Sequence, residues 1–239
     1  MYQERDYRNR MKSEDLVSYK ISRLETDLFV STDIDLMETT KRLVNKYRTE
    51  IEVYAKINPD FITSLKPIII NESVPSIVFH MSSVAQRGGV GPMAAVAGAI
   101  SQYVGQHLID YSENVIIENG GDLFIKTNIT RKIRIFAGDS LFSNKLNLII
   151  SPDETPLGIC TSSGTIGHSF SYGKADAVVV VSEDTLLADA CATATCNIIQ
   201  GKDDINKGIE FIKTINDIKG CIIIKDDKLG IWGDIRISK

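Results

Sequence analysis

The sequence lacks several features that mark whole classes of protein. No apolar run approaches the roughly 20 residues of a membrane-spanning helix, so no membrane partner is expected. Residues 1–8 are polar and lack the apolar core of a signal peptide, which predicts a cytoplasmic protein. The formal net charge of -4 reflects no excess of basic residues, so nucleic acid is not an expected partner.

Cysteine is scarce, and its spacing follows no known motif. The four cysteines are Cys160, Cys191, Cys196 and Cys221, and no two of them form a Cys-x-x-Cys pair. Neither a zinc site nor a dithiol redox site is therefore expected. In a reducing compartment we expect these residues to be small buried hydrophobic groups.

The remaining composition is ordinary for a globular protein. Of the 239 residues, 43% are apolar and 24% are charged, which is enough to bury a sizeable core. The expected helices and strands come in blocks and do not alternate strictly, which predicts an α+β fold with a mostly antiparallel sheet flanked by helices. Because no repeat or linker interrupts the chain, one domain over residues 1–239 is the simplest organisation.

Hydrophobic periodicity indicates where the elements lie. Strands are predicted at 16–25, 27–31, 115–118, 122–126, 132–136, 146–150, 158–161, 175–181, 220–224 and 229–232. Helices are predicted from a cap at Thr32 or Asp33 to about residue 55, and over 74–86, 92–111, 185–199 and 205–215. The 175–181 strand is almost wholly apolar, so we expect it to be buried on both faces. The 92–111 helix is rich in Ala, Gly and Ser, which allows close backbone packing.

One acidic residue stands out within an otherwise apolar helix. Asp189 is the only charged residue between Asp184 and Lys202, and an ionised carboxylate in such surroundings is costly unless it is paired. Thr193 lies one helical turn further on, on the same face. A carboxylate and a hydroxyl together suit a hard cation such as Mg²⁺. The alternative is that Asp189 accepts backbone N–H bonds from a neighbouring loop or pairs with a buried Arg.

A glycine turn separates two predicted strands at residues 118–122, which read Glu-Asn-Gly-Gly-Asp. Asn-Gly is the strongest short signal for a β-hairpin. Two glycines also allow a ligand to approach the backbone closely. The two interpretations of Asn119, Gly120, Gly121 and Asp122 are compatible.

A loop rich in hydroxyl groups follows the strand at 158–161. Its hydroxyl residues and glycine are Thr161, Ser162, Ser163, Gly164 and Thr165, and His168 comes shortly after them. Such a loop suits phosphate oxygens, and His168 is a candidate general acid or base, although a lone His is more often a polar surface or turn residue. The loop contains no Gly-x-Ser-x-Gly, so a serine hydrolase site receives little support.

Another glycine cluster opens the predicted 92–111 helix. Gly88, Gly89 and Gly91 precede Pro92, and the free N–H groups of a helix N-terminus can bind an anion. The pattern is neither Gly-x-Gly-x-x-Gly nor a P-loop, so the common nucleotide-binding motifs are absent. A tight helix–helix connection is the alternative interpretation.

Together these segments resemble the ApbE-like superfamily, whose characterised members are magnesium-dependent FMN transferases that take FMN from FAD and attach it to a Thr or Ser of a target protein. The motif order is similar: an Asn-x-Gly-Gly-Asp-type turn at 118–122, a Thr-Ser-Gly segment at 161–164 leading to His168, and Ala-Asp-Ala-x-Ala-Thr-Ala at 188–194. The stretch at 90–99, Val-Gly-Pro-Met-Ala-Ala-Val-Ala-Gly-Ala, is typical of a smaller branch of that superfamily.

The resemblance implies an ApbE-like layered fold, FAD or FMN and Mg²⁺ as cofactors, and an acceptor protein as partner. Asp189 and Thr193 would be the metal ligands, Gly120, Gly121 and Asp122 would line the flavin site, and His168 would stand in the catalytic region. The chain lacks the paired His and the Asp-Pro that the transferases carry there.

Three functions follow from this resemblance. The first is a flavin transferase or FAD pyrophosphate hydrolase. The alternatives are a flavin- or nucleotide-binding protein without catalysis, and an enzyme of sulfur or cofactor metabolism that uses the same pocket for another anionic substrate. The sequence leaves open whether the chain forms a homo-oligomer.

Overall fold

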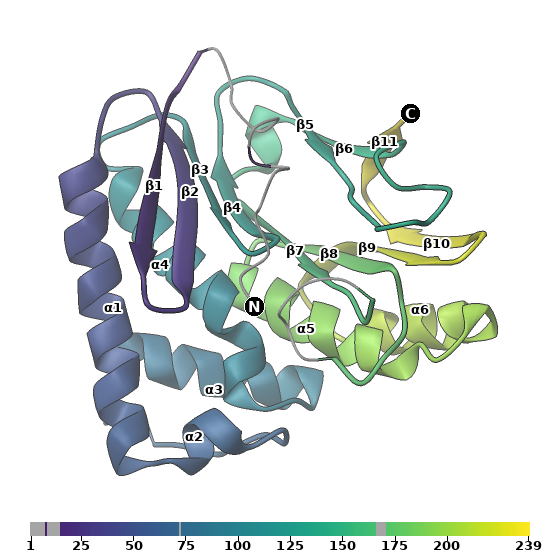
Figure 1. The fold of residues 1–239 in the computed structure, drawn as a ribbon, viewed down its shortest axis with the longest axis horizontal. Coiled ribbons are helices and arrows are strands. Elements are labelled where there is room, and N and C mark those ends of the chain that lie inside the picture. The colour runs from purple at the N-terminus through teal and green to yellow at the C-terminus, as the bar shows by residue number, and fades with distance from the viewer. Residues whose placement is uncertain (1–7, 9–14, 72, 166–170) are drawn as a thin grey trace.

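The computed structural model describes residues 8, 15–71, 73–165 and 171–239. Within them, eight strands form one sheet in the order β1-β2-β3-β4-β7-β8-β9-β10 (Figure 1). Every neighbouring pair in this sheet is antiparallel. The strands are β1 (Val17–Arg23), β2 (Thr26–Thr32), β3 (Val115–Asn119), β4 (Asp122–Lys126), β7 (Leu157–Ser162), β8 (Ala177–Ser182), β9 (Ile218–Lys225) and β10 (Lys228–Gly233).

Helices cover one face of this sheet (Figure 1). They are α1 (Met37–Ile57), α2 (Asp60–Thr63), α3 (Ser76–Gly88), α4 (Val96–Leu108), α5 (Thr185–Ile198) and α6 (Ile205–Lys213), with short 3₁₀ segments η2 (Pro92–Ala95), η3 (Pro152–Glu154) and η4 (Lys202–Asp204). Helix α5 lies against β7 and β8 on one side and against α3 and α4 on the other. This central place explains why α5 is apolar almost all round.

A smaller sheet covers part of the opposite face. In the described part of the chain it contains β5 (Arg131–Arg134), β6 (Asn147–Ile150) and β11 (Arg236–Ser238), in the order β11-β6-β5. Strand β8 therefore lies between two cores: Val178 and Val180 face the helices, while Val179 and Val181 face the smaller sheet. The predicted α+β architecture and the two-sided burial of this strand are both confirmed.

One predicted helix start is wrong. Neither Thr32 nor Asp33 caps the first helix, whose N-cap is Leu36 without a side-chain cap. Asp33 instead accepts hydrogen bonds from Ser112 and Asn114, about 80 positions along the chain. The helix predicted to start at Pro92 begins as the 3₁₀ segment η2, and α4 follows it. The sequence analysis also missed α2 and β11.

The four cysteines are buried free thiols, as expected. No helix within the described ranges has both the length and the apolarity needed to cross a membrane.

Candidate functional site

The glycine turn is a two-residue β-hairpin loop that places Asp122. Gly120 and Gly121 have φ values of 71° and 110°, and Asn119 pairs with Asp122 across the turn. Positive φ at both central positions favours glycine, so the hairpin interpretation is confirmed. The turn lies beside β7, since the Thr161 N–H donates to Asp122 Oδ1 at 3.2 Å. A Cβ added at Gly121 would lie 3.7 Å from the Thr161 carbonyl oxygen.

Asp189 lies where α5 meets the first turn of α4. Its side chain is buried, and Oδ2 accepts the Gly98 N–H at 2.8 Å. Burial raises the pKa of the Asp189 carboxyl well above its usual range, the nearby Asp122 carboxylate adds to the rise, and the N–H groups of Gly98 and Ala97 oppose it. The backbone-acceptor interpretation therefore holds for one oxygen. The partial positive charge of the α4 N-terminus stabilises this carboxylate.

Cys160 is a neighbour of this carboxylate pair that the sequence analysis did not identify. Its thiol lies on β7 and donates to the Thr185 carbonyl at 3.3 Å. Burial raises the pKa of the Cys160 thiol well above its usual range, and the charges of Asp122 and Asp189 raise it further. A thiol kept protonated in this way is a poor nucleophile. Sequence spacing could not reveal this environment, because Asp122 and Asp189 are 38 and 29 positions away from Cys160 and lie on other elements.

The donors at this site suit a hard divalent cation. Asp122 and Asp189 supply carboxylate oxygens, and Thr193 supplies a half-buried hydroxyl one turn beyond Asp189 on α5. The described residues contain no group of three or more His, Cys, Asp and Glu arranged for a metal, so the candidate donors here are two carboxylates and one hydroxyl. Two neighbouring buried carboxylates repel each other, as the raised pKa of Asp189 reflects. A divalent cation would remove that repulsion, so the residues fit Mg²⁺.

The hydroxyl loop divides into two parts. Thr161 and Ser162 lie at the end of β7 beside the turn, and the buried Ser162 hydroxyl lies within hydrogen-bonding reach of the Cys196 thiol. Ser163 and Thr165 face the 175–176 segment instead: Ser163 Oγ donates to the Ala175 carbonyl at 3.4 Å, and Thr165 Oγ1 to Asp176 Oδ1 at 3.4 Å.

The structure gives a steric reason for Gly164 but does not describe the predicted catalytic histidine. A Cβ at Gly164 would lie 1.9 Å from the Gly173 carbonyl oxygen, so this glycine is required by the fold of the loop itself. His168 lies outside the described residues, and its predicted role stays a prediction.

The Gly88 to Gly91 connection packs against other chain segments. A Cβ at Gly88 would lie 3.4 Å from the Ala190 carbonyl oxygen, so this end of α3 lies on α5 next to Asp189. Gly89 ends α3 in a left-handed conformation, with φ of 69°. A Cβ at Gly91 would lie 1.8 Å from the Ser64 carbonyl oxygen. The contacts of Gly88 and Gly91 and the left-handed conformation of Gly89 agree with a tight helix–helix connection. The anion-binding role of these three glycines stays a prediction.

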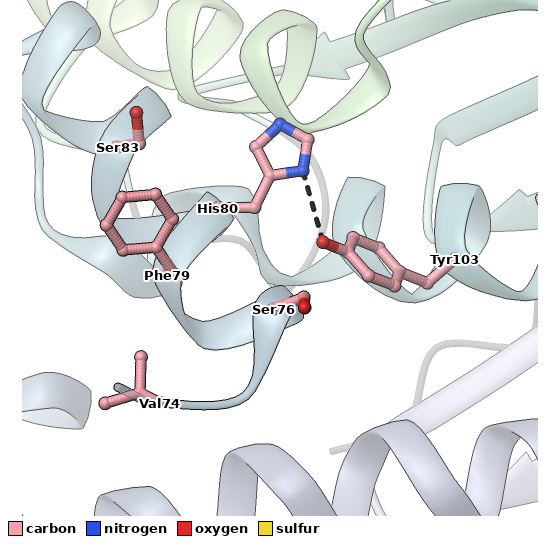
Figure 2. A pocket seen from close by; sticks show the side chains of 6 residues that line it. All are labelled: Val74, Ser76, Phe79, His80, Ser83 and Tyr103. Carbon is pink, nitrogen blue, oxygen red and sulfur yellow. Dashed lines mark hydrogen bonds between the residues drawn. The ribbon is translucent and has the colours of Figure 1, made fainter. Parts of the chain in front are cut away.

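A second group of polar side chains lies around a cavity beside α3, where the sequence analysis predicted no site. A cavity of about 290 Å³ is lined by Val74, Ser76, Phe79, His80, Ser83 and Tyr103. Figure 2 shows His80 and Tyr103 pointing toward each other from α3 and α4, with the Tyr103 hydroxyl 3.5 Å from His80 Nδ1. The other ring nitrogen, Nε2, lies 2.9 Å from Asp184 Oδ2. His80 and Asp184 are 104 positions apart, so no local pattern could have joined them.

Asp184 also caps α5, and this double role gives a pH-dependent prediction. Burial opposes ionisation of Asp184, but the hydrogen bond and charge of His80 and the N–H groups of Leu187 and Leu186 outweigh it and lower the pKa of the carboxyl. A depressed folded-state pKa stabilises the fold above the unfolded-state value, about 3.9, and this contribution is lost as the pH falls through the folded-state value.

Asp184→Asn should therefore lower the free energy of unfolding at neutral pH by about 1 kcal/mol, because Asn keeps the cap but not the charge. The difference from the wild-type protein should fade below about pH 4. Urea denaturation over a pH series measures both values. A difference that stayed constant down to acid pH would contradict the assigned role of the charge.

The comparisons with known proteins identify a family. Residues 8–210 match the family model described as AbpE bacteria. A UPF0280 protein of Methanococcus aeolicus is 36% identical over 226 residues, which cover 92% of this chain and 91% of the relative. A UPF0280 protein of Methanocaldococcus jannaschii is 36% identical over 217 residues, which cover 88% of each.

Solved structures show the same fold. A mutant of the flavin transferase ApbE from Vibrio cholerae superposes with a TM-score of 0.59 at 13% identity, over 91% of this chain and 96% of that chain. The apo flavinyl transferase ApbE from Pseudomonas stutzeri gives 0.57 at 13% identity, over 94% of both chains. The predicted ApbE-like layered fold is thereby confirmed, and the chain belongs to the AbpE bacteria family, in company with the UPF0280 proteins.

Proposed function

We propose that this protein is a magnesium-dependent enzyme that cleaves FAD, either as an FMN transferase or as an FAD pyrophosphate hydrolase. One observation carries the proposal: the buried Asp189 carboxylate accepts the Gly98 N–H in the first turn of α4, close enough to Asp122 for the two charges to interact. ApbE proteins with the same fold are flavin transferases, which supports a flavin nucleotide as substrate.

In this proposal Asp189 and Thr193 hold Mg²⁺, with Asp122 beside them. The ion, when bound, neutralises charge on the pyrophosphate oxygens. The Gly120-Gly121 turn admits the flavin to close approach, since neither residue has a side chain. The Ser162 hydroxyl, buried at the end of β7, is a proposed hydrogen-bond donor to the ligand.

The other predicted residues complete the proposed site. Thr161, Ser163, Gly164 and Thr165 on one loop, and Gly88, Gly89 and Gly91 on another, are the proposed binding segments for the rest of the nucleotide. Asn119 shapes the turn, and its side-chain amide donates to the Ala97 carbonyl at 3.2 Å, which ties the turn to α4. His168 is the proposed group for proton transfer.

The proposed reaction breaks the FAD pyrophosphate bond between its two phosphoryl groups. AMP leaves, and FMN passes to a hydroxyl oxygen of an acceptor protein or to water. In both cases the attacking oxygen forms a bond to the FMN phosphorus, the bridging oxygen leaves with AMP, and the proton of the attacking hydroxyl or water passes to His168, the proposed proton-transfer group.

One experiment tests the proposal. Purified protein is mixed with FAD, with Mg²⁺ or with EDTA, and AMP release is followed together with flavin fluorescence. We expect AMP release that requires Mg²⁺. Saturable flavin binding without AMP release would replace the proposal by a non-catalytic flavin-binding protein. Absence of flavin binding would favour an enzyme that uses the pocket for another anionic substrate.

A further inference from the structure

We propose that Arg8 is a positioning residue for the glycine turn of the candidate site, acting through Glu118. This inference rests on the proposed function for its kinetic consequence, but its structural part can be tested without it. It assigns to the N-terminal part of the chain a role in ordering the flavin-binding turn.

The contacts of Arg8 are short and buried. Its Nε lies 2.6 Å from Glu118 Oε2, and its NH1 lies 2.6 Å from Asp27 Oδ2. NH2 also donates to the Asp27 carbonyl oxygen at 2.6 Å. The exposed fractions are 2% for Arg8, 7% for Asp27 and 1% for Glu118. Only the planar guanidinium fork can serve two carboxylates and a carbonyl at once, because its five N–H donors point in fixed directions.

Glu118 connects Arg8 to the turn through its two carboxylate oxygens. While Oε2 accepts from Arg8, the other oxygen, Oε1, accepts the Gly121 N–H at 3.0 Å. Glu118 is on β3, and Gly121 is the second residue of the turn, so this bond fixes the turn to the end of β3. Asp122 and Thr161, joined by a hydrogen bond at 3.2 Å, come directly after and beside it.

The turn needs such a bond because of its composition. Gly120 and Gly121 carry no side chains, so the backbone at the turn has more conformational freedom than any other dipeptide would allow. A buried carboxylate that loses its cation is costly to keep in place. Loss of the Arg8 guanidinium removes the 2.6 Å ion pair to Glu118 Oε2, which loosens the carboxylate that accepts the Gly121 N–H. The position of the turn would then spread over several conformers.

The test compares Arg8→Gln with Arg8→Lys and with a matched control, Arg23→Gln. Arg23 also joins a strand to a carboxylate, Glu52, at 3.3 Å, but its partners lie on α1 and none of them belongs to the turn. Amide hydrogen exchange of Gly121 reads the turn directly. We expect exchange at Gly121 to accelerate at least about tenfold in Arg8→Gln, as loss of one charge-assisted hydrogen bond implies. It should accelerate less in Arg8→Lys and remain unchanged in Arg23→Gln.

Kinetics supply the second readout. In Arg8→Gln we expect KM for FAD to rise about tenfold while kcat changes by less than about threefold, because the turn binds the flavin and does not perform the chemistry. Arg8→Lys, which keeps the charge, should recover part of the loss. If Arg8→Gln does not fold, Arg8→Lys against Arg23→Gln decides by the same two measurements.

The outcomes separate the two proposals. Unchanged Gly121 exchange in both Arg8 variants overturns the positioning role, whatever the enzyme does. Accelerated Gly121 exchange with an unchanged KM overturns its link to flavin binding. A wild-type protein that neither binds nor cleaves FAD overturns the proposed function, and the exchange measurement still decides whether Arg8 orders the turn.

Discussion

Asp189→Asn should abolish magnesium-dependent turnover of FAD, with a fall of at least about 100-fold in kcat/KM. The amide still accepts the Gly98 N–H that Asp189 accepts at 2.8 Å, but it provides no anionic oxygen for the cation. AMP release at saturating Mg²⁺ measures the effect. Retention of wild-type turnover would remove Asp189 from the proposed metal site.

The same variant should fold normally, which keeps the result interpretable. Because burial and Asp122 raise the pKa of the Asp189 carboxyl, its contribution favours folding at low pH and is lost as the pH rises through the folded-state value. Without metal at neutral pH, Asn should therefore be at least as stable as Asp. Mg²⁺ should raise the melting temperature of the wild-type protein but not that of the variant. Asp184→Asn, on the same helix, should keep turnover and serves as the matched control.

The strands were predictable because their information is local. Period-two alternation and apolar runs mark most of them, and the apolar run of β8 correctly indicated burial on both faces. The first helix start was not predictable from the same kind of signal. Asp33 is a good capping residue by type, yet contacts with Ser112 and Asn114 hold it outside the helix. Tertiary partners of this kind leave no trace in the neighbouring sequence.

The candidate site was predictable only in part. Asp189 stands out because a charge in an apolar helix requires a partner, and the sequence alone could name either a cation or a backbone donor. The structure adds both Gly98 and Asp122 around it. The Arg8–Glu118 and His80–Asp184 contacts escaped the sequence analysis because they join residues 110 and 104 positions apart.

Glycine patterns were ambiguous for a physical reason. A residue without Cβ permits close approach by a ligand or by another part of the chain, and the sequence does not distinguish the two. At Gly91 and Gly164 the approaching group is the chain itself, at Ser64 and Gly173. At Gly120 the positive φ is required by the hairpin. The contacts at Gly91 and Gly164 join residues that are not neighbours in the sequence, so only the fold reveals them, whereas the Asn-Gly signal already predicted the hairpin at Gly120.

Gly98→Ala should destabilise the protein and disturb the site together. A Cβ at Gly98 would lie 2.6 Å from the Thr185 carbonyl oxygen and 3.0 Å from Asp189 Cβ. Both belong to the rigid helix α5, so α4 must move away from it. We expect a loss of about 1–3 kcal/mol in the free energy of unfolding, which lowers the melting temperature by about 2–12 °C. Thermal and urea unfolding measure this.

The sign of that change is the decisive part of the measurement. In an unconstrained helix, Ala is more favourable than Gly by about 0.5–1 kcal/mol, so a stabilised variant would show that α4 and α5 are not in close contact at this position. Gly201→Ala is the matched control, because an added Cβ there meets nothing within 4 Å, and its effect should stay within about 0.5 kcal/mol. The Gly98 N–H, which donates to Asp189, must move with α4. The variant should therefore also lose magnesium affinity, because the Asp189 carboxylate is no longer held in place.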